Sequence, residues 1–310
     1  DGFTSLRSPQ PHFAEFAVSI PPDHVPGEIE WPKGPTNPRT DFAVASHTRL
    51  DEKAFIRRVN AASENSTGVF VHGYNYNFPE ALFRTAQMTA DAQISDAPVL
   101  FSWPSSASLL GYASDRESVT YSRDALAELL TRLADTSGGK PVTVFGHSMG
   151  GWLVMETLRQ MRIAGEDEAL SRLEVVLAAP DIDVDVFRQQ LAVIGRMEIP
   201  MVIMVSPDDR ALGLSALAGQ RTRVGALDIT DPAVQVAAQQ NNVVLIDISA
   251  VDASSSLNHD RYIQLASAFP ALARETRQGS TFTEAGAFVL SSTGQLLSAP
   301  LRVVDAALGQ

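Results

Sequence analysis

A serine in a glycine-rich turn is the residue whose setting points most directly to chemistry. The segment GHSMG, residues 146–150, follows the apolar run PVTVF and precedes a helix-forming stretch. It fits G-x-S-x-G, the nucleophile elbow, in which a sharp strand-to-helix turn exposes the serine. Glycine is needed two residues before and after the serine because a Cβ there would collide with neighbouring backbone. An ordinary glycine-rich turn is the alternative, but the flanking elements favour Ser148 as a nucleophile.

A serine hydroxyl needs a base to take its proton and a third group to orient that base. Along a chain with a nucleophile elbow the order is serine, then an acid, then histidine. One histidine follows Ser148, namely His259, in the loop SSSLNHD after the run NVVLIDIS. Because the carboxyl ends of parallel strands share one edge of the sheet, we expect His259 on the same rim as Ser148. The alternative is a solvated loop histidine.

Two neighbouring aspartates, Asp208 and Asp209, are the main candidates for the acid. They follow the run PMVIMVS, two expected strands after the one that carries the serine. We favour Asp209 because a few turn residues usually separate the strand end from the acid, and Asp208 could instead cap the next helix. The earlier segment AAPDIDVD supplies weaker candidates, Asp181 and Asp183, which could equally cap a helix.

An oxyanion hole requires two backbone N–H donors. One is expected from Met149, directly after the nucleophile. The other is expected from Tyr74, in the segment VHGYN, where Gly73 lets the backbone come close. The alternative for this segment is an ordinary turn with His72 bonded to a backbone group.

Short apolar runs alternate with helix-forming segments from residue 42 onward. Most runs are continuous β-branched or aliphatic stretches, as is typical of strands covered on both faces. The repeated order predicts an α/β fold with a mostly parallel central sheet and helices on both sides. The expected strands are FAVAS (42–46), GVFVHGY (68–74), PVLFSW (98–103), PVTVF (141–145), EVVLAAP (174–180), PMVIMVS (200–206) and NVVLIDIS (242–249). The expected helices cover residues 79–92, 123–133 and 152–163.

The regions on either side of this pattern differ from it. Residues 1–41 are rich in proline, which fixes φ and removes an N–H donor, so we expect an irregular arm lying on the domain surface. Residues 42–270 form the expected catalytic domain. Residues 271–310 are apolar without a clean period, and their packing is left open.

Composition narrows the possible partners. The chain has 310 residues, a net charge of −12 and no cysteine. The negative charge disfavours nucleic acid as a partner, and no apolar run reaches the roughly 18 residues of a membrane span. Without cysteine there is neither a disulfide nor a cysteine nucleophile. The histidines show no metal-ligand spacing, so we expect no metal and no cofactor. A small-molecule ester is the expected partner, and the oligomeric state stays open.

Several motifs together resemble one family. VFVHGYNYNFPEALFRTAQM, VLFSWPS, FGHSMGG, AAPDID and SPDDRALGLS are similar to the bacterial α/β-hydrolase family known as domain of unknown function 900. The resemblance runs from about residue 15 to about residue 265. It implies Ser148 as nucleophile, Asp209 as acid, His259 as base, and an esterase-like activity. Members often carry an amino-terminal export or lipoprotein signal, so it also implies an exported, processed chain.

These observations predict a serine carboxylesterase that hydrolyses short-to-medium acyl esters through an acyl-enzyme. A thioesterase or amidase would use the same triad, and a non-catalytic binding protein on a hydrolase scaffold is the alternative from another class. Leu109, Leu110 and Tyr112 could form an acyl wall or simply pack as part of a helix.

Overall fold

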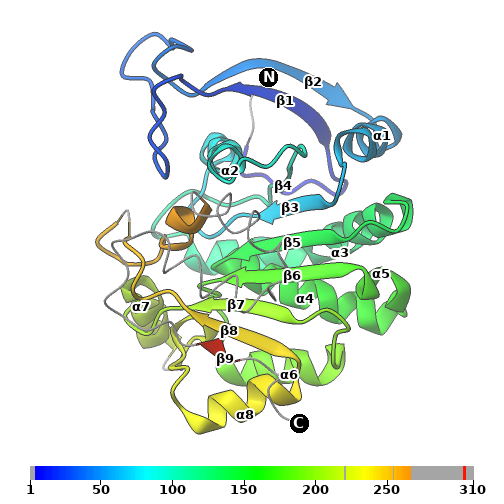
Figure 1. Cartoon of the computed structure of the whole chain (residues 1–310), viewed down its shortest axis with the longest axis vertical. Helices are drawn as coiled ribbons and strands as arrows, with labels where there is room; N and C mark the ends of the chain where they lie inside the picture. The colour runs from blue at the N-terminus through cyan, green and yellow to red at the C-terminus, as the bar shows by residue number, and fades with distance from the viewer. Residues whose placement is uncertain (1–3, 220, 254, 267–302, 305–310) are drawn as a thin grey trace, which may run out of the picture.

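A seven-stranded sheet forms the centre of the molecule in the computed structural model, which describes residues 4–219, 221–253, 255–266 and 303–304. The strand order is β4-β3-β5-β6-β7-β8-β9, and all pairs are parallel except β8–β9 (Figure 1). The strands are β3 (Thr67–Val71), β4 (Val99–Phe101), β5 (Val142–His147), β6 (Leu173–Ala178), β7 (Met201–Val205), β8 (Val243–Asp247) and β9 (Val303–Val304). The predicted α/β fold with a mostly parallel sheet is confirmed.

Helices connect the parallel strands. They are α1 (Glu52–Ala62), α2 (Phe78–Asp91), α3 (Tyr112–Thr136), α4 (Met149–Ala164), α5 (Asp167–Ser171), α6 (Val184–Ile194), α7 (Arg210–Gly219), the 3₁₀ helix η1 (Val224–Ala226) and α8 (Pro232–Gln240). The three predicted helices correspond to α2, α3 and α4. Helix α3 begins well before the expected residue 123. The prediction missed its first half because the buried residues there include the polar Asp115, Ser118 and Ser122, which conceal the helical period of apolar residues.

The buried runs of the sequence form the core between sheet and helices. Leu126, Leu130 and Leu133 of α3 pack with Leu153 and Leu158 of α4, and all five are almost completely buried. This packing holds α4 against the sheet. The first residue of α4 follows Ser148 directly.

A second, two-stranded sheet lies beyond the end of the central sheet that β4 and β3 form (Figure 1). It pairs β1 (Phe13–Ser19) with β2 (Ala43–Leu50) in antiparallel order. The prediction of little regular structure in the first forty residues is therefore wrong for β1, and the run FAVAS does not join the central sheet. Aromatic packing explains the position of β1, because Phe13 packs on Phe55 of α1 and Phe16 packs on Phe78 of α2.

The chain between β1 and β2, residues 20–42, is tied to α2 by polar contacts. His24 lies between two carboxylates, with Nδ1 2.9 Å from Glu30 and Nε2 2.9 Å from Asp91. The N–H of Gly27 donates to Asp91 at 2.7 Å. Burial alone would raise the pKa of Glu30. Hydrogen bonds and the positive charge of His24 outweigh this effect and lower the pKa of Glu30. We call residues 20–42 the arm.

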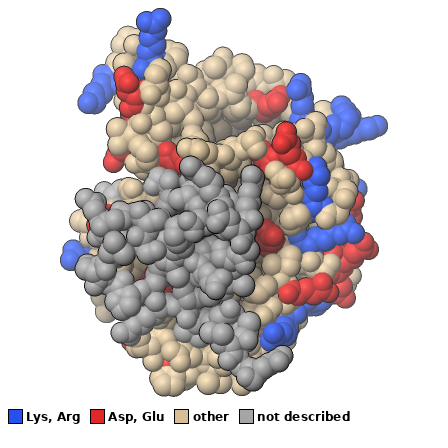
Figure 2. All heavy atoms as spheres, viewed as in Figure 1, with Lys and Arg blue, Asp and Glu red and all other residues tan. Residues whose placement is uncertain are grey.

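The face of the molecule in Figure 2 shows acidic and basic side chains intermixed among the coloured atoms. No helix in the described part of the chain combines the length and apolar character that crossing a bilayer requires. The prediction about residues 271–310 falls outside the described residues, apart from β9. There Val303 and Val304 pair with Ile246 and Leu245 of β8.

We expect His24→Ala to lower the free energy of unfolding by about 1–3 kcal/mol, because it leaves the buried carboxylate of Asp91 without its histidine partner. Urea unfolding measures the change. The exposed His12, whose side chain contacts Ser8, provides the control, and His12→Ala should stay within about 0.5 kcal/mol of the parent protein. Equal effects of the two substitutions would refute an anchoring role for His24.

Candidate active site

Ser148 lies in a strained turn between β5 and α4. Its backbone has φ 53° and ψ −120°, a conformation that residues other than glycine rarely adopt. A Cβ at Gly150 would lie 2.3 Å from the carbonyl oxygen of His72, and a Cβ at Gly146 would lie 2.9 Å from the Cα of Gly151. The two glycines of the motif are thus required by close backbone approach. The amino terminus of α4 starts at Met149 and places the positive end of its dipole beside the serine.

The structure brings Asp209 and His259 together from loops 50 residues apart. The Nδ1–H of His259 donates to Asp209 Oδ2 at 2.7 Å. The carboxylate of Asp209 is buried, and its other oxygen accepts the N–H of Leu212 in the first turn of α7. No hydrogen bond joins Ser148 to His259 among the described residues, and such contacts are often long before substrate binds.

Asp208 has a different set of partners. Its carboxylate receives two hydrogen bonds of 2.8 Å from Arg261 and one of 2.7 Å from Ser206. The side-chain amide of Asn258 also donates to it at 3.1 Å. Asp208 therefore fastens the loop that carries His259 to the loop that carries Asp209. The sequence offered no sign of this role, which depends on Arg261.

The loop after β3 lies against Ser148. A Cβ at Gly73 would lie 3.1 Å from Ser148 Cβ and 2.7 Å from His147 Nδ1. Neither the N–H of Tyr74 nor that of Met149 donates to another described group. Two free N–H groups beside the serine are what an oxyanion hole requires.

His72, which directly follows β3, holds this loop in place. Its ring stacks on Trp103 with centroids 4.8 Å apart, and the Trp103 indole N–H donates to the His72 carbonyl at 2.8 Å. His72 Nδ1 lies 2.9 Å from the carbonyl oxygen of Gly73. Burial lowers the pKa of His72 to about 4, so the ring is neutral near pH 7. The structure thus places His72 as a bonded, buried support for the predicted oxyanion loop.

His147, the residue before Ser148, was not singled out in the sequence analysis. Its ring packs on Tyr262 at 4.3 Å and on His259 at 4.8 Å. His147 Nε2 lies 3.3 Å from the carbonyl oxygen of His259. Burial is the main cause that holds the pKa of His147 well below 6.5, followed by the nearby charge of His259. A neutral His147 thus holds the backbone of His259 beside the elbow.

The remaining acid candidates are engaged elsewhere. Asp181 accepts hydrogen bonds of 2.7 Å from Tyr112 and from Ser215, and Asp183 caps α6. Burial, with the charge of Asp181, raises the pKa of Tyr112 to about 12.

The expected acyl wall is not a single surface. Leu109 and Leu110 are 80% and 96% exposed on a loop, whereas Tyr112 begins α3. Within the described residues no group of three histidine or acidic side chains could hold a metal ion.

The contacts of Asp208 generate a pH prediction. Burial alone would raise its pKa, but hydrogen bonds from Ser206 and Arg261 outweigh it and hold the pKa below the usual 3.8. A lowered native pKa contributes stability above the unfolded value of about 3.9 and loses it as pH falls through the native value. We therefore expect Asp208→Asn to cost about 0.5–1.5 kcal/mol at pH 7, a modest value because 52% of the side chain is exposed.

This difference from the parent protein should shrink as pH falls from about 4 through the lowered native pKa, because Asp208 becomes neutral first in the unfolded and then in the folded protein. Urea unfolding from pH 7 to pH 3 measures it. Glu128, exposed on α3, gives the matched control, since Glu128→Gln should differ little from the parent at any pH. A penalty for Asp208→Asn that does not change with pH would contradict the assignment.

Comparison with known proteins places the chain in a family. The model of the alpha/beta hydrolases of unknown function (DUF900) matches residues 48–276. A curated relative, the uncharacterized protein alr1448 of Nostoc sp. strain PCC 7120, is 39% identical over 61 residues, which cover 20% of this chain and 16% of that protein. The crystal structure of a presumed hydrolase from Agrobacterium vitis S4 is 15% identical, with a TM-score of 0.39 over 67% of this chain and 89% of that one. Because the family model matches well over half of its residues, this chain belongs to the alpha/beta hydrolases of unknown function (DUF900).

Proposed function

We propose that this α/β hydrolase is a serine carboxylesterase that acts on short-to-medium acyl esters. The observation that carries the proposal is the hydrogen bond of 2.7 Å between His259 Nδ1 and the buried carboxylate of Asp209, on the same rim as the strained Ser148. With Nδ1–H donated to Asp209, the other ring nitrogen of His259 is left as a base.

In the proposed reaction, His259 Nε2 takes the proton of the Ser148 hydroxyl while Oγ attacks the ester carbonyl carbon. The negative charge that develops on the carbonyl oxygen is stabilised by the N–H groups of Tyr74 and Met149. His259 then gives its proton to the departing alcohol as the carbon–oxygen bond breaks, which leaves an acyl group on Ser148. Water repeats the sequence, frees the acid and restores the serine.

The other two histidines of the site favour His259 as the proton carrier. Burial lowers the pKa of His72 to about 4 and holds that of His147 well below 6.5. Both rings therefore stay neutral near pH 7 and support the loops around them. His259 is partly exposed and is the only one of the three with a carboxylate partner among the described residues.

Ser148→Ala removes the nucleophile and should lower kcat/KM for p-nitrophenyl butyrate by about 10³-fold or more. A fluorophosphonate probe should label the parent protein and not the variant. Matched p-nitrophenyl thioester and anilide substrates would show whether the ester is preferred. A correctly folded parent protein that neither turns over esters nor takes up the probe would refute the proposal and favour a binding role.

The two neighbouring aspartates should differ in their effect on rate. Asp209→Asn removes the group that orients His259, so kcat should fall by about 10²-fold or more. Asp208→Asn weakens only the contact between the loops, and a loss of less than about tenfold is expected. Steady-state kinetics of the two variants at pH 8 give the comparison. The reverse order of effects would assign the acid to Asp208.

A further inference from the structure

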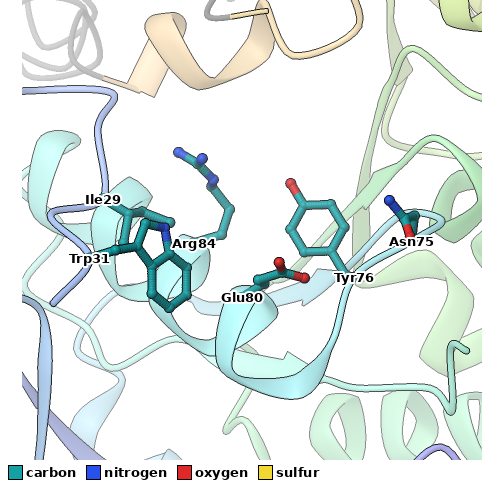
Figure 3. Close-up of a pocket in the computed structure, with 6 residues that line it drawn as sticks. All are labelled: Ile29, Trp31, Asn75, Tyr76, Glu80 and Arg84. Carbon is teal, nitrogen blue, oxygen red and sulfur yellow. The ribbon is translucent and has the colours of Figure 1, made fainter. Parts of the chain in front are cut away.

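A cavity lies where the arm meets α2, beside the oxyanion loop. Its volume is about 240 Å³. Figure 3 shows the residues that line it: Ile29, Trp31, Asn75, Tyr76, Glu80 and Arg84. The arm thus supplies an apolar wall, and α2 with the loop before it supplies the polar side.

Tyr76 links this cavity to the surroundings of Ser148. Asn75 and Tyr76 continue the loop that starts at Gly73, whose Cα carries no side chain and lies against Ser148. The ring of Tyr76 also faces His147, with centroids 6.4 Å apart. A substrate held at Ser148 could therefore extend past Tyr76 into the cavity.

Arg84 gives the cavity an uncompensated positive charge. Its Nη1 donates to two neutral oxygens, the Gly27 carbonyl at 3.0 Å and Gln87 Oε1 at 2.6 Å. No described carboxylate forms an ion pair with it. Glu80 is one turn away on the same helix, but its Oε2 accepts the N–H of Asn77 in a capping box at 2.8 Å. In Figure 3 the guanidinium group points away from Glu80.

The charge of Arg84 acts on two side chains beside the elbow. Burial is the main cause that lowers the pKa of His147, and the positive charge of Arg84 acts in the same direction. Burial raises the pKa of Tyr262, and Arg84 opposes that effect. A cation close enough to influence both side chains is also close enough to attract a charged part of a substrate bound at the elbow.

We propose that the cavity binds a carboxylate of the substrate through Arg84, so that the enzyme favours esters that carry a second, free carboxylate group. The inference rests on the proposed esterase function and gives it a substrate class. A guanidinium group presents its N–H donors in a fork that matches the two oxygens of a carboxylate. The apolar surfaces of Ile29 and Trp31 limit competing water on one side and leave room for the methylene groups between ester and carboxylate.

The test compares esters that differ only in charge. Mono-p-nitrophenyl adipate and p-nitrophenyl hexanoate place the charge on the acyl side, and 4-acetoxybenzoate and its methyl ester place it on the alcohol side. The readout is the ratio of kcat/KM for the charged and the neutral ester of each pair. We expect Arg84→Met to lower this ratio about tenfold in one pair.

Two further variants sharpen the comparison. Arg57→Met removes the same charge from an exposed position on α1 and should leave the ratio at the parent value. Arg84→Lys keeps the charge but not the fork, and should lower the ratio about threefold. It replaces Arg84→Met if thermal unfolding shows that the methionine variant does not fold.

The possible results separate the two proposals. If the esters are hydrolysed and the ratio is the same in the parent and the Arg84 variants for both pairs, the carboxylate site is wrong and the esterase stands. If the parent is inert, titration calorimetry with monomethyl adipate decides. Binding that weakens about tenfold in Arg84→Met would support the cavity while the esterase proposal fails. Equal binding in parent and variant, or none in the parent, would overturn the cavity proposal too.

Discussion

The backbone of α4 approaches the end of β3 so closely that residue 150 has no room for a side chain. A Cβ at Gly150 would lie 2.3 Å and 2.4 Å from the carbonyl oxygens of His72 and Val71. This approach depends on the apolar packing of α4 under the sheet, and it leaves the chain only a sharp turn between β5 and α4. Ser148 absorbs the strain with φ 53°. The loop after β3 is in turn held beside the serine.

Polar contacts fix the positions of the two loops that apolar packing does not hold. The loop after β7 and the loop after β8 carry Asp209 and His259, and each is exposed on one side. Arg261 and Asp208 join them through paired hydrogen bonds, and the ring of His147 holds the backbone of His259. The geometry of the His259–Asp209 pair is therefore set before any substrate arrives. Electrostatic stabilisation of a transition state depends on polar groups that are already in position.

The central sheet and the elbow were predictable because their signals are local. A buried parallel strand is a run of apolar residues, and an elbow needs glycine at fixed positions. The neighbours Asp208 and Asp209 were harder to distinguish. A turn is closed by a hydrogen bond from the Asp209 N–H to the Ser206 carbonyl. It buries the carboxylate of Asp209 and leaves the side chain of Asp208 52% exposed. That outcome depends on Arg261 and His259, which are about 50 residues away.

Strand β1 and the start of α3 escaped prediction for related reasons. In β1 the partner strand lies beyond a proline-rich stretch, so pairing could not be read from either segment alone. In α3 the first two turns bury Asp115, whose carboxylate accepts from Ser105 and from the N–H of Ser106. A buried face made of polar groups has no apolar period to detect. Likewise, the contacts that define the roles of His147, Arg84 and Trp31 come from neighbours far along the chain.

The arm is fastened by a few charged, backbone and aromatic contacts, whereas the sheet behind it is fastened by a continuous apolar core. Segments held in this way can open at a free-energy cost below that of global unfolding. Ile29 and Trp31, which wall the cavity, belong to this segment. Any molecule seated against them would favour the closed position of the arm, and by linkage the closed arm would favour that molecule to the same extent.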